Sequence, residues 1–504
     1  MLAALTHPVH AAVVALYLLA LLALGARKAR GVRSAEDFSL AGRGLGAAVL
    51  TGTLVATWIG TGSLFGNAEK AYQDGTVAFL LAIPGALGIL ALWWIASRVR
   101  RLEQVTIQDV LEARFGVVAR LLGTVALVCA YVIIVSYQYR AGAAVLGMLA
   151  PELSRPLCIV LVALFVIAYT ALAGMVSVAR TDVANGLLMI LGIAIALPIL
   201  LVRAGGLDGV AESLDGAGVS STVWSPLHAV SILLPTILLL LGDANMVQRF
   251  FSAKDERAAR RAAGWMFVGT CALELAIIAT ALVGRALVEQ GKLAAPENPA
   301  HVLLVLAFEA LPPIVGALLV ATAVAVVVST ADSYLLAPAT SVVRDVVQRF
   351  VAPKASDRAL VLSSRVVVVV LGAIALVMAF GSSGFFEVAL FAYTIYGASI
   401  TPVLLAAYFW RRATPTAAVA SMLAGLGGSI GWRWLVEQGA LERWASAAGL
   451  DALADAAARV RASELDAVLP AVAASTLVLV IVTLLSRRAP DDQRGRAAFS
   501  AGDR

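Results

Sequence analysis

The stretch VVVSTADSYLLAPATS, residues 326–341, places six polar side chains inside a long apolar run. These are Ser329, Thr330, Asp332, Ser333, Thr340 and Ser341. A soluble core or a plain membrane anchor would avoid such a cluster, and an acid at membrane depth is by default functional. Val326, Ser329, Thr330 and Ser333 share one face of a helix because they are spaced i, i+3, i+4 and i+7. The stretch therefore predicts a polar site on one face of a membrane helix.

The composition places this helix in a polytopic membrane protein. The chain has 504 residues, 61% hydrophobic and 14% charged, with a mean hydropathy of +0.91. Soluble domains are nearer half apolar and a quarter charged. Many apolar runs of about 20 residues are each long enough to cross a bilayer, and their Leu/Ala/Val/Gly content favours helices over barrel strands. We therefore predict an all-α membrane protein rather than several soluble domains.

The same composition argues against several other classes of protein. The three cysteines lie in apolar runs and the four histidines are scattered, so neither a disulfide scaffold nor a zinc site is expected. The net charge of +6 is attributed to cytoplasmic loops, not to nucleic-acid binding. We find no nucleotide-phosphate loop and no acid–base or nucleophile constellation, so we do not expect an enzyme.

The apolar runs predict about thirteen spans. Basic residues gather in the connections after odd-numbered spans. By the positive-inside rule, this pattern places the N-terminus outside the cell and the C-terminus in the cytoplasm. The membrane is then the plasma (inner) membrane. The expected spans are 8–26, 45–70, 77–97, 117–149, 157–175, 180–203, 226–248, 263–288, 313–346, 359–381, 385–409, 414–436 and 467–486.

Two of these spans are interrupted, and this suggests two inverted repeats. The second span carries Gly60, Gly62 and Gly66, and the seventh carries Pro235 and a Gly-Asp pair. Paired breaks in corresponding spans point to a transporter binding site. The expected organisation is an extra helix and cytoplasmic loop (1–44), a first repeat (45–203), a second repeat (226–409), two extra helices (410–486) around an external loop (437–466), and a disordered tail (487–504).

Five segments resemble the sodium:solute symporter family. STADSYLLAPATSVVRDV resembles its signature, and the others occur in the family's order: SAEDFSLAGRGLG, ATWIGTGSLFGNAEKAYQDG, ARTDVANGLLM and MVQRFFSAKDERAARRA. The resemblance runs from about residue 34 to 412. It implies a LeuT-type inverted-repeat fold and Na+-coupled symport of a small organic solute by alternating access.

The resemblance also implies a sodium site. Na+ is a hard cation that takes oxygen ligands. The family's conserved site corresponds here to the carbonyls of Ala56, Ile59 and Val326 and to the hydroxyls of Ser329 and Thr330. From the residues alone, another interpretation stays open: Ser and Thr also bond back to the preceding turn or join membrane helices.

A second cation site is expected around Asp182, Asp332 and Ser333. In the family the acid matching Asp182 lies on the sodium path, and in some members it binds a second sodium. Asp332 replaces a hydroxyl of that pattern, so the site holds either a second Na+ or a proton. The alternative for Asp182 is a charge at the start of a helix.

The solute is expected near the first break, around Thr57, Trp58, Thr61 and Ser63. Trp58 offers a stacking wall, although membrane Trp is often only packing.

Gln138 and Arg140 lie on the fourth span, and Tyr393 is a candidate outer gate. A buried Arg140 suits a carboxylate, as in an amino acid or organic acid. It would otherwise snorkel or pair with an acid such as Asp243.

Several points stay open at this stage. We expect Asp243 to be structural, Gln248 and Arg249 to form a cytoplasmic helix end, and Glu274 and Arg285 to have no assigned role. Rival interpretations are proton coupling in the same fold, a neutral solute such as a sugar or polyol, and a sensor domain. The expected partners are the solute, sodium ions and membrane lipid, with no nucleic acid and no obligatory protein partner.

Overall fold

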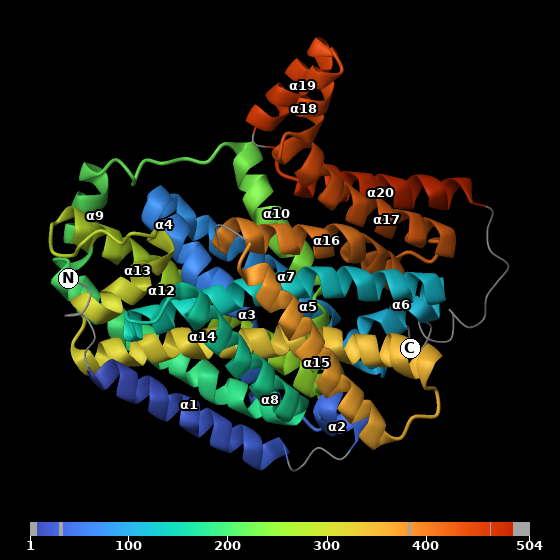
Figure 1. The fold of residues 1–504 in the computed structure, drawn as a ribbon, viewed down its shortest axis with the longest axis horizontal. Helices are drawn as coiled ribbons and strands as arrows, with labels where there is room; N and C mark the ends of the chain where they lie inside the picture. The colour runs from blue at the N-terminus through green and yellow to red at the C-terminus, as the bar shows by residue number, and fades with distance from the viewer. Residues whose placement is uncertain (1–7, 30–33, 382–384, 464, 487–504) are drawn as a thin grey trace.

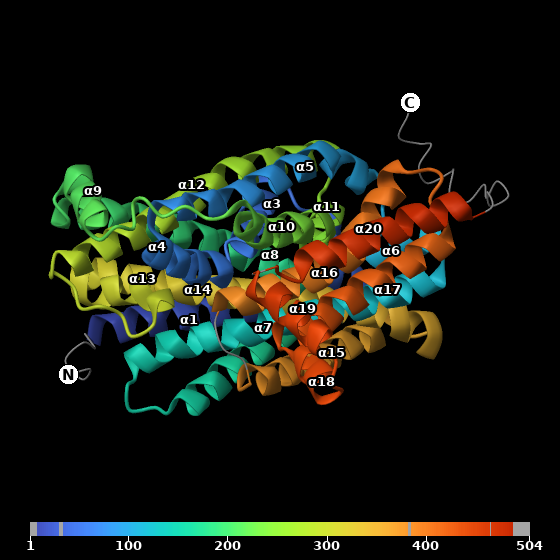
Figure 2. The same cartoon turned by 90° about the horizontal axis from the view of Figure 1, so that it is seen from above.

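The computed structural model describes residues 8–29, 34–381, 385–463 and 465–486. In these residues every extended regular element is a helix, and ten helices are long and apolar enough to cross a membrane. The long helices run broadly along the long axis of the molecule, with α9 and α13 at one end and α6 toward the other (Figures 1 and 2). The all-α polytopic class is confirmed, whereas the expected count of thirteen spans is not.

The helices have the following bounds. They are α1 (Pro8–Ala29), α2 (Ala35–Leu40), α3 (Ala47–Trp58), α4 (Ala68–Asp74), α5 (Ala82–Arg101), α6 (Ile107–Phe115), α7 (Val117–Leu149), α8 (Arg155–Arg203), α9 (Gly206–Gly216), α10 (Pro226–Gly242), α11 (Ala244–Ser252), α12 (Glu256–Glu289), α13 (Val302–Val305), α14 (Pro313–Ser341), α15 (Asp357–Ala379), α16 (Phe385–Phe409), α17 (Pro415–Trp432), α18 (Ala440–Ala447), α19 (Asp451–Ala462) and α20 (Val468–Leu485).

The helix α14, which carries the hydroxyl-rich stretch, lies inside the bundle. It packs against α1, α7, α8 and α3, and nearly every side chain from Leu319 onward is buried. Because small residues and hydroxyls dominate this helix, neighbouring backbones can approach it closely. Its polar face therefore meets protein rather than lipid.

The expected break in the second span is present. Helix α3 stops at Trp58, Ile59 is non-helical (φ −69°, ψ 88°), and a π-helix resumes over Gly62–Asn67. The glycines are required by close approach. A Cβ on Gly60 would lie 3.1 Å from the Thr330 hydroxyl, and one on Gly62 would lie 3.0 Å from that of Tyr393. The break thus lies directly against α14 and α16.

The second expected break separates α10 from α11. Asp243 is extended (φ −63°, ψ 116°), and its carboxylate accepts a 2.9 Å hydrogen bond from the backbone N–H of Met246. The carbonyl of Gly242 is satisfied by the Tyr396 hydroxyl at 2.8 Å. Asp243 is therefore the N-cap of α11, because a helix start within the membrane must satisfy its N–H groups internally.

The prediction of a connection between two spans near residues 176–179 is wrong. The chain stays helical through it, and the only interruption is a kink at Gly174 (φ 62°, ψ 174°). Phe38 approaches so closely that a Cβ on Gly174 would lie 2.9 Å from its ring. Asp182 consequently lies about two turns inside the helical segment Gly174–Arg203, so it is not a charge at a helix start.

The segment expected as an external loop, 437–466, contains the helices α18 and α19, which project from the bundle (Figure 1). The expected disordered tail, 487–504, lies outside the described residues.

A buried cluster of ion pairs holds the C-terminal end of the signature segment, at Asp345. The Arg120 guanidinium donates to Asp109 at 2.7 Å, to Asp345 at 2.6 Å and also to Glu112. Asp345 further accepts from Thr124 at 3.0 Å. This cluster joins α6 and α7 to the π-helix that continues α14. Arg344 also pairs with Asp109 at 3.7 Å and Arg349 with Glu112 at 2.9 Å, so several cations together limit the desolvation cost of these acids.

Candidate functional site

The first part of the site is the contact between the break in α3 and α14. The Ser329 Oγ lies 3.1 Å from the carbonyl oxygen of Ala56 and 2.6 Å from a carboxylate oxygen of Asp182. The Thr330 hydroxyl is buried and has no hydrogen-bond partner among the described residues. Ile59 and Val326 are both buried at this contact. A buried hydroxyl without a partner beside freed carbonyls fits a hard cation held by oxygen ligands.

Asp182 is the centre of a hydrogen-bond network behind this contact. It is fully buried and accepts from the hydroxyls of Thr53 at 2.5 Å and Ser329 at 2.6 Å. The Arg249 guanidinium lies 3.3 Å from the same carboxylate and donates to Thr53 at 2.9 Å. The network therefore joins α3, α8, α11 and α14 through one acid.

Arg249 lies in the last turn of α11, at a helix end as expected, but it is among the largest fully buried side chains. Its Nη2 donates to Ser333 Oγ at 2.7 Å, and Ser333 in turn contacts the Thr57 hydroxyl at 3.2 Å. Guanidinium stays charged in proteins, so it supplies a fixed positive charge between Asp182 and Ser333. The sequence signal was the Gln-Arg element, which alone does not show its depth.

The three residues expected at the second cation site are only partly gathered. Asp182 and Ser333 meet around Arg249. Asp332 points elsewhere and accepts a hydrogen bond from Thr170, before the kink of α8. Asp332 is 2% exposed, and no ion pair to it is found among the described residues.

A cavity lies on the other side of the break, bounded by the α3 break region, α5, α7, α10, α12, α14 and α16. Four of the residues expected to bind the solute line it, namely Thr57, Trp58, Ser63 and Tyr393. Thr330 lines it as well, so the ion contact and the cavity share a wall. Thr61, Gln138 and Arg140 are buried but are not among its lining residues.

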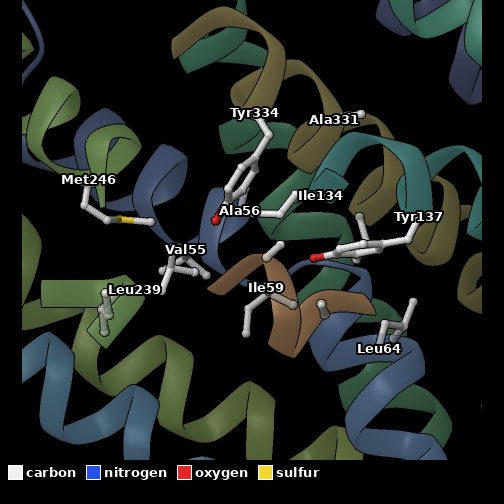
Figure 3. Packing of buried hydrophobic residues seen from close by; sticks show 14 of the residues in the cluster. Val55, Ala56, Ile59, Leu64, Ile134, Tyr137, Leu239, Met246, Ala331 and Tyr334 are labelled. Carbon is white, nitrogen blue, oxygen red and sulfur yellow. The ribbon is translucent and has the colours of Figure 1, made fainter. Parts of the chain in front are cut away.

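Aromatic side chains close much of this cavity. The hydroxyls of Tyr137 and Tyr393 are 3.3 Å apart. In Figure 3, Tyr137 and Tyr334 direct their hydroxyl ends toward the segment that carries Ala56 and Ile59. Both tyrosines line the cavity, and Tyr334 also donates to Asp243 at 3.3 Å. This arrangement joins the two helix breaks through a single aromatic wall.

Glu274 on α12 is a functional candidate that the sequence reasoning missed. Its carboxylate lines the cavity and accepts from Ser63 at 2.6 Å and Asn67 at 2.7 Å. Arg285, on the same helix, pairs with Glu289 at 2.7 Å. The sequence did contain a signal that could have identified Glu274, because an acidic residue inside a membrane span is functional by default.

Arg140 lies three residues after Tyr137 on α7, so the two are about one helical turn apart. It is 5% exposed. Gln138 is fully buried, and its side-chain amide has no hydrogen bond within the described part of the chain. Neither residue lines the cavity, although both lie close to Tyr137 along α7.

Comparison with known proteins agrees with this geometry. The profile of the sodium:solute symporter family matches residues 38–425. The chain belongs to the sodium:solute symporter family. It is thus a multi-pass membrane transporter and not an enzyme, and sodium is its coupling ion.

The sequence identity to individual members of the family is low. The chain is 28% identical to the high-affinity proline transporter PutP of Bacillus subtilis (strain 168), over 79% of this chain and 86% of the relative. It is 26% identical to the sodium/pantothenate symporter of Escherichia coli (strain K12), over 77% and 83%.

Among solved structures, a Na+-coupled sialic acid symporter in its substrate-bound outward-open state aligns with a TM-score of 0.78 at 17% identity, covering 96% of this chain and 99% of that one. The nucleobase-cation-symport-1 family transporter MHP1 aligns with a TM-score of 0.56 at 14% identity, over 92% and 98%. The expected LeuT-type fold is confirmed.

The Asp182–Arg249 pair yields a stability prediction. Removing one partner of a buried ion pair costs about 3–5 kcal/mol because it strands the other charge. Arg249→Met and Asp182→Asn should each lower the thermal stability of the purified protein in sodium-free buffer, and the double variant should lose clearly less than the sum.

The matched control is the exposed pair Arg101–Glu256, with N···O of 2.8 Å. Its variants Arg101→Met and Glu256→Gln should each cost only about 0–1 kcal/mol. Strictly additive losses at Asp182 and Arg249 would contradict the pairing.

Proposed function

We propose that the protein imports a small carboxylate-bearing solute, driven by Na+, through alternating access. The observation that carries this proposal is the shared wall: Thr330 faces both the break in α3 and the solute cavity. An ion bound at Ala56, Ile59, Val326, Ser329 and Thr330 would stabilise the same helix break that bounds the solute.

The inward movement of sodium supplies enough free energy to drive accumulation of the solute. Each sodium charge moved down the membrane potential supplies about 2.3 kcal/mol per 100 mV. Sodium would connect α3 to α14 and favour the outward-open state, and the solute would then favour closure under Tyr393. Differential affinity for the two states shifts the population, and no mechanical push is required. Release of sodium to the cytoplasm past Asp182 then completes the transport cycle.

The orientation belongs to the same proposal. Arg98, Arg100 and Arg101 at the end of α5 lie beside the start of α12, where Arg101 contacts Glu256 at 2.8 Å. Positive charge gathered at one end of the bundle favours that end as the cytoplasmic side of the plasma membrane. The N-terminus then faces outside and the C-terminus inside.

Support for a carboxylate comes from chemistry shared by the relatives. Proline, pantothenate and sialic acid, which the relatives' names specify, all carry one. Arg140 is the proposed partner because it is buried one turn beyond Tyr137 of the cavity wall, and a guanidinium binds a carboxylate through two parallel hydrogen bonds.

Proton coupling is a second candidate. It is favoured by Asp332, a buried acid that accepts a hydrogen bond from the neutral Thr170. Uptake into proteoliposomes driven by a pH gradient without sodium would support this alternative, and sodium-driven uptake at constant pH would contradict it.

The main test is uptake of radiolabelled proline, pantothenate and other small acids into proteoliposomes with an inward sodium gradient. Ser329→Ala and Thr330→Ala should each raise the sodium concentration for half-maximal uptake at least about tenfold, because a bond to a charged group is worth about 1.5–3 kcal/mol.

The control is Ser364→Ala, which removes a buried hydroxyl that donates only to its own helix at Leu360. It should leave the sodium dependence unchanged. An unaltered sodium dependence in both site variants would reject the ion-site assignment.

Arg140→Ala should reduce the apparent affinity for a transported carboxylate at least about tenfold, because a charge-assisted bond is lost, while half-saturation by sodium stays the same. The comparison variant is Arg203→Ala, whose guanidinium donates to the backbone of Ala310 at 2.8 Å. Undiminished carboxylate uptake by Arg140→Ala would remove the residue from the solute site.

A further inference from the structure

Glu274 is the only acidic or basic side chain among the lining residues of the solute cavity, as far as the described chain extends. It is 5% exposed and projects from α12 toward the segment beyond the break in α3. A buried carboxylate is costly unless a cation or a proton compensates it. The cavity wall itself contributes no Lys, Arg or His.

The hydrogen-bond partners of Glu274 are neutral. One oxygen accepts from the Ser63 hydroxyl at 2.6 Å and the other from the Asn67 amide at 2.7 Å. A carboxylate has about four acceptor positions, so about half of its capacity is left for a ligand. These two bonds orient the carboxylate without neutralising it.

Two bases on the helical segments that carry Glu274 and its partner Asn67 are engaged elsewhere. Arg285, on the same helix, pairs with Glu289 at 2.7 Å and lies over the ring of Tyr72. Lys70, one turn beyond Asn67, lies 3.6 Å from Asp74 and over the ring of Phe386. Within the described residues, neither cation forms an ion pair with Glu274.

The remaining walls favour a cation as well. Aromatic rings from four helical segments line the same cavity, and the faces of aromatic rings attract organic cations, Trp most strongly. They are Trp58, Tyr137, Tyr334, Phe386 and Tyr393. An acid beside several aromatic rings is a combination that selects a positively charged nitrogen over a neutral or anionic group.

We propose that Glu274 binds a positively charged nitrogen of the transported solute. This inference rests on the proposed function, since the ligand is the cargo. Combined with a carboxylate partner elsewhere, it makes the solute a small zwitterion. Anions without a charged nitrogen, and neutral polyols, would leave Glu274 uncompensated in a closed cavity and should be excluded.

The test measures solute binding to purified full-length protein by thermal shift and titration calorimetry, in sodium chloride and in potassium chloride. The probes are L-proline, glycine betaine and L-lysine, set against N-acetyl-L-proline, pantothenate and glucose. Wild type should bind at least one of the first group and none of the second. Glu274→Gln should weaken that binding at least about 30-fold, because its partner charge is lost in a buried pair.

Glu289→Gln is the matched control, on the same helix but paired with Arg285 near the helix end. It should bind like the wild type. The stabilisation by sodium alone should be the same in all three proteins, which shows that Glu274→Gln is folded and retains its ion site.

Three results would overturn the inference. They are binding of N-acetyl-L-proline, pantothenate or glucose as tightly as the charged-nitrogen probes, unchanged binding by Glu274→Gln, and failure of every charged-nitrogen probe to bind wild type. Sodium-dependent binding of an anion or a sugar would reject this inference and leave symport intact. Equal behaviour in sodium and potassium chloride would instead count against the proposed sodium coupling.

Discussion

The contact on which the rest of the site depends is that of Ser329 with the end of α3. Its hydroxyl lies between the carbonyl of Ala56 and the carboxylate of Asp182, so three helices, α3, α8 and α14, meet at one oxygen. The break that follows Trp58 is tolerated inside a membrane because the backbone polar groups that it frees find partners in the protein or in a bound ion. The ion contact and the solute cavity both arise from that requirement.

Around the site, some buried acids are compensated by a neighbouring arginine and others are not. Arg249 compensates Asp182 behind the ion contact, and Arg120 compensates the acids at the end of the signature. Glu274 and Asp332 instead have only neutral hydrogen-bond donors among the described residues. These two buried acids are the places where a transported charge or proton would bring the largest electrostatic gain.

Much of the fold was accessible from the sequence because its signals are strong and local. Apolar length marked the spans, and Gly60, Gly62, Pro235 and Asp243 marked both breaks. The site was accessible in part, since Ser329 and Thr330 carry their own oxygens. The burial of Arg249 and the cavity position of Glu274 depend on which neighbour each helix face meets, and helical periodicity in an apolar chain does not encode this.

The most direct measurement is saturable binding of radiolabelled sodium to the purified protein, without a solute or a gradient. The account predicts saturable binding to the wild type and its loss when Ser329 and Thr330 are both changed to Ala in a protein that still folds. Binding of the same affinity and amount by that double variant would show that sodium binds elsewhere, and would contradict the assignment of the helix break and α14 as the ion site.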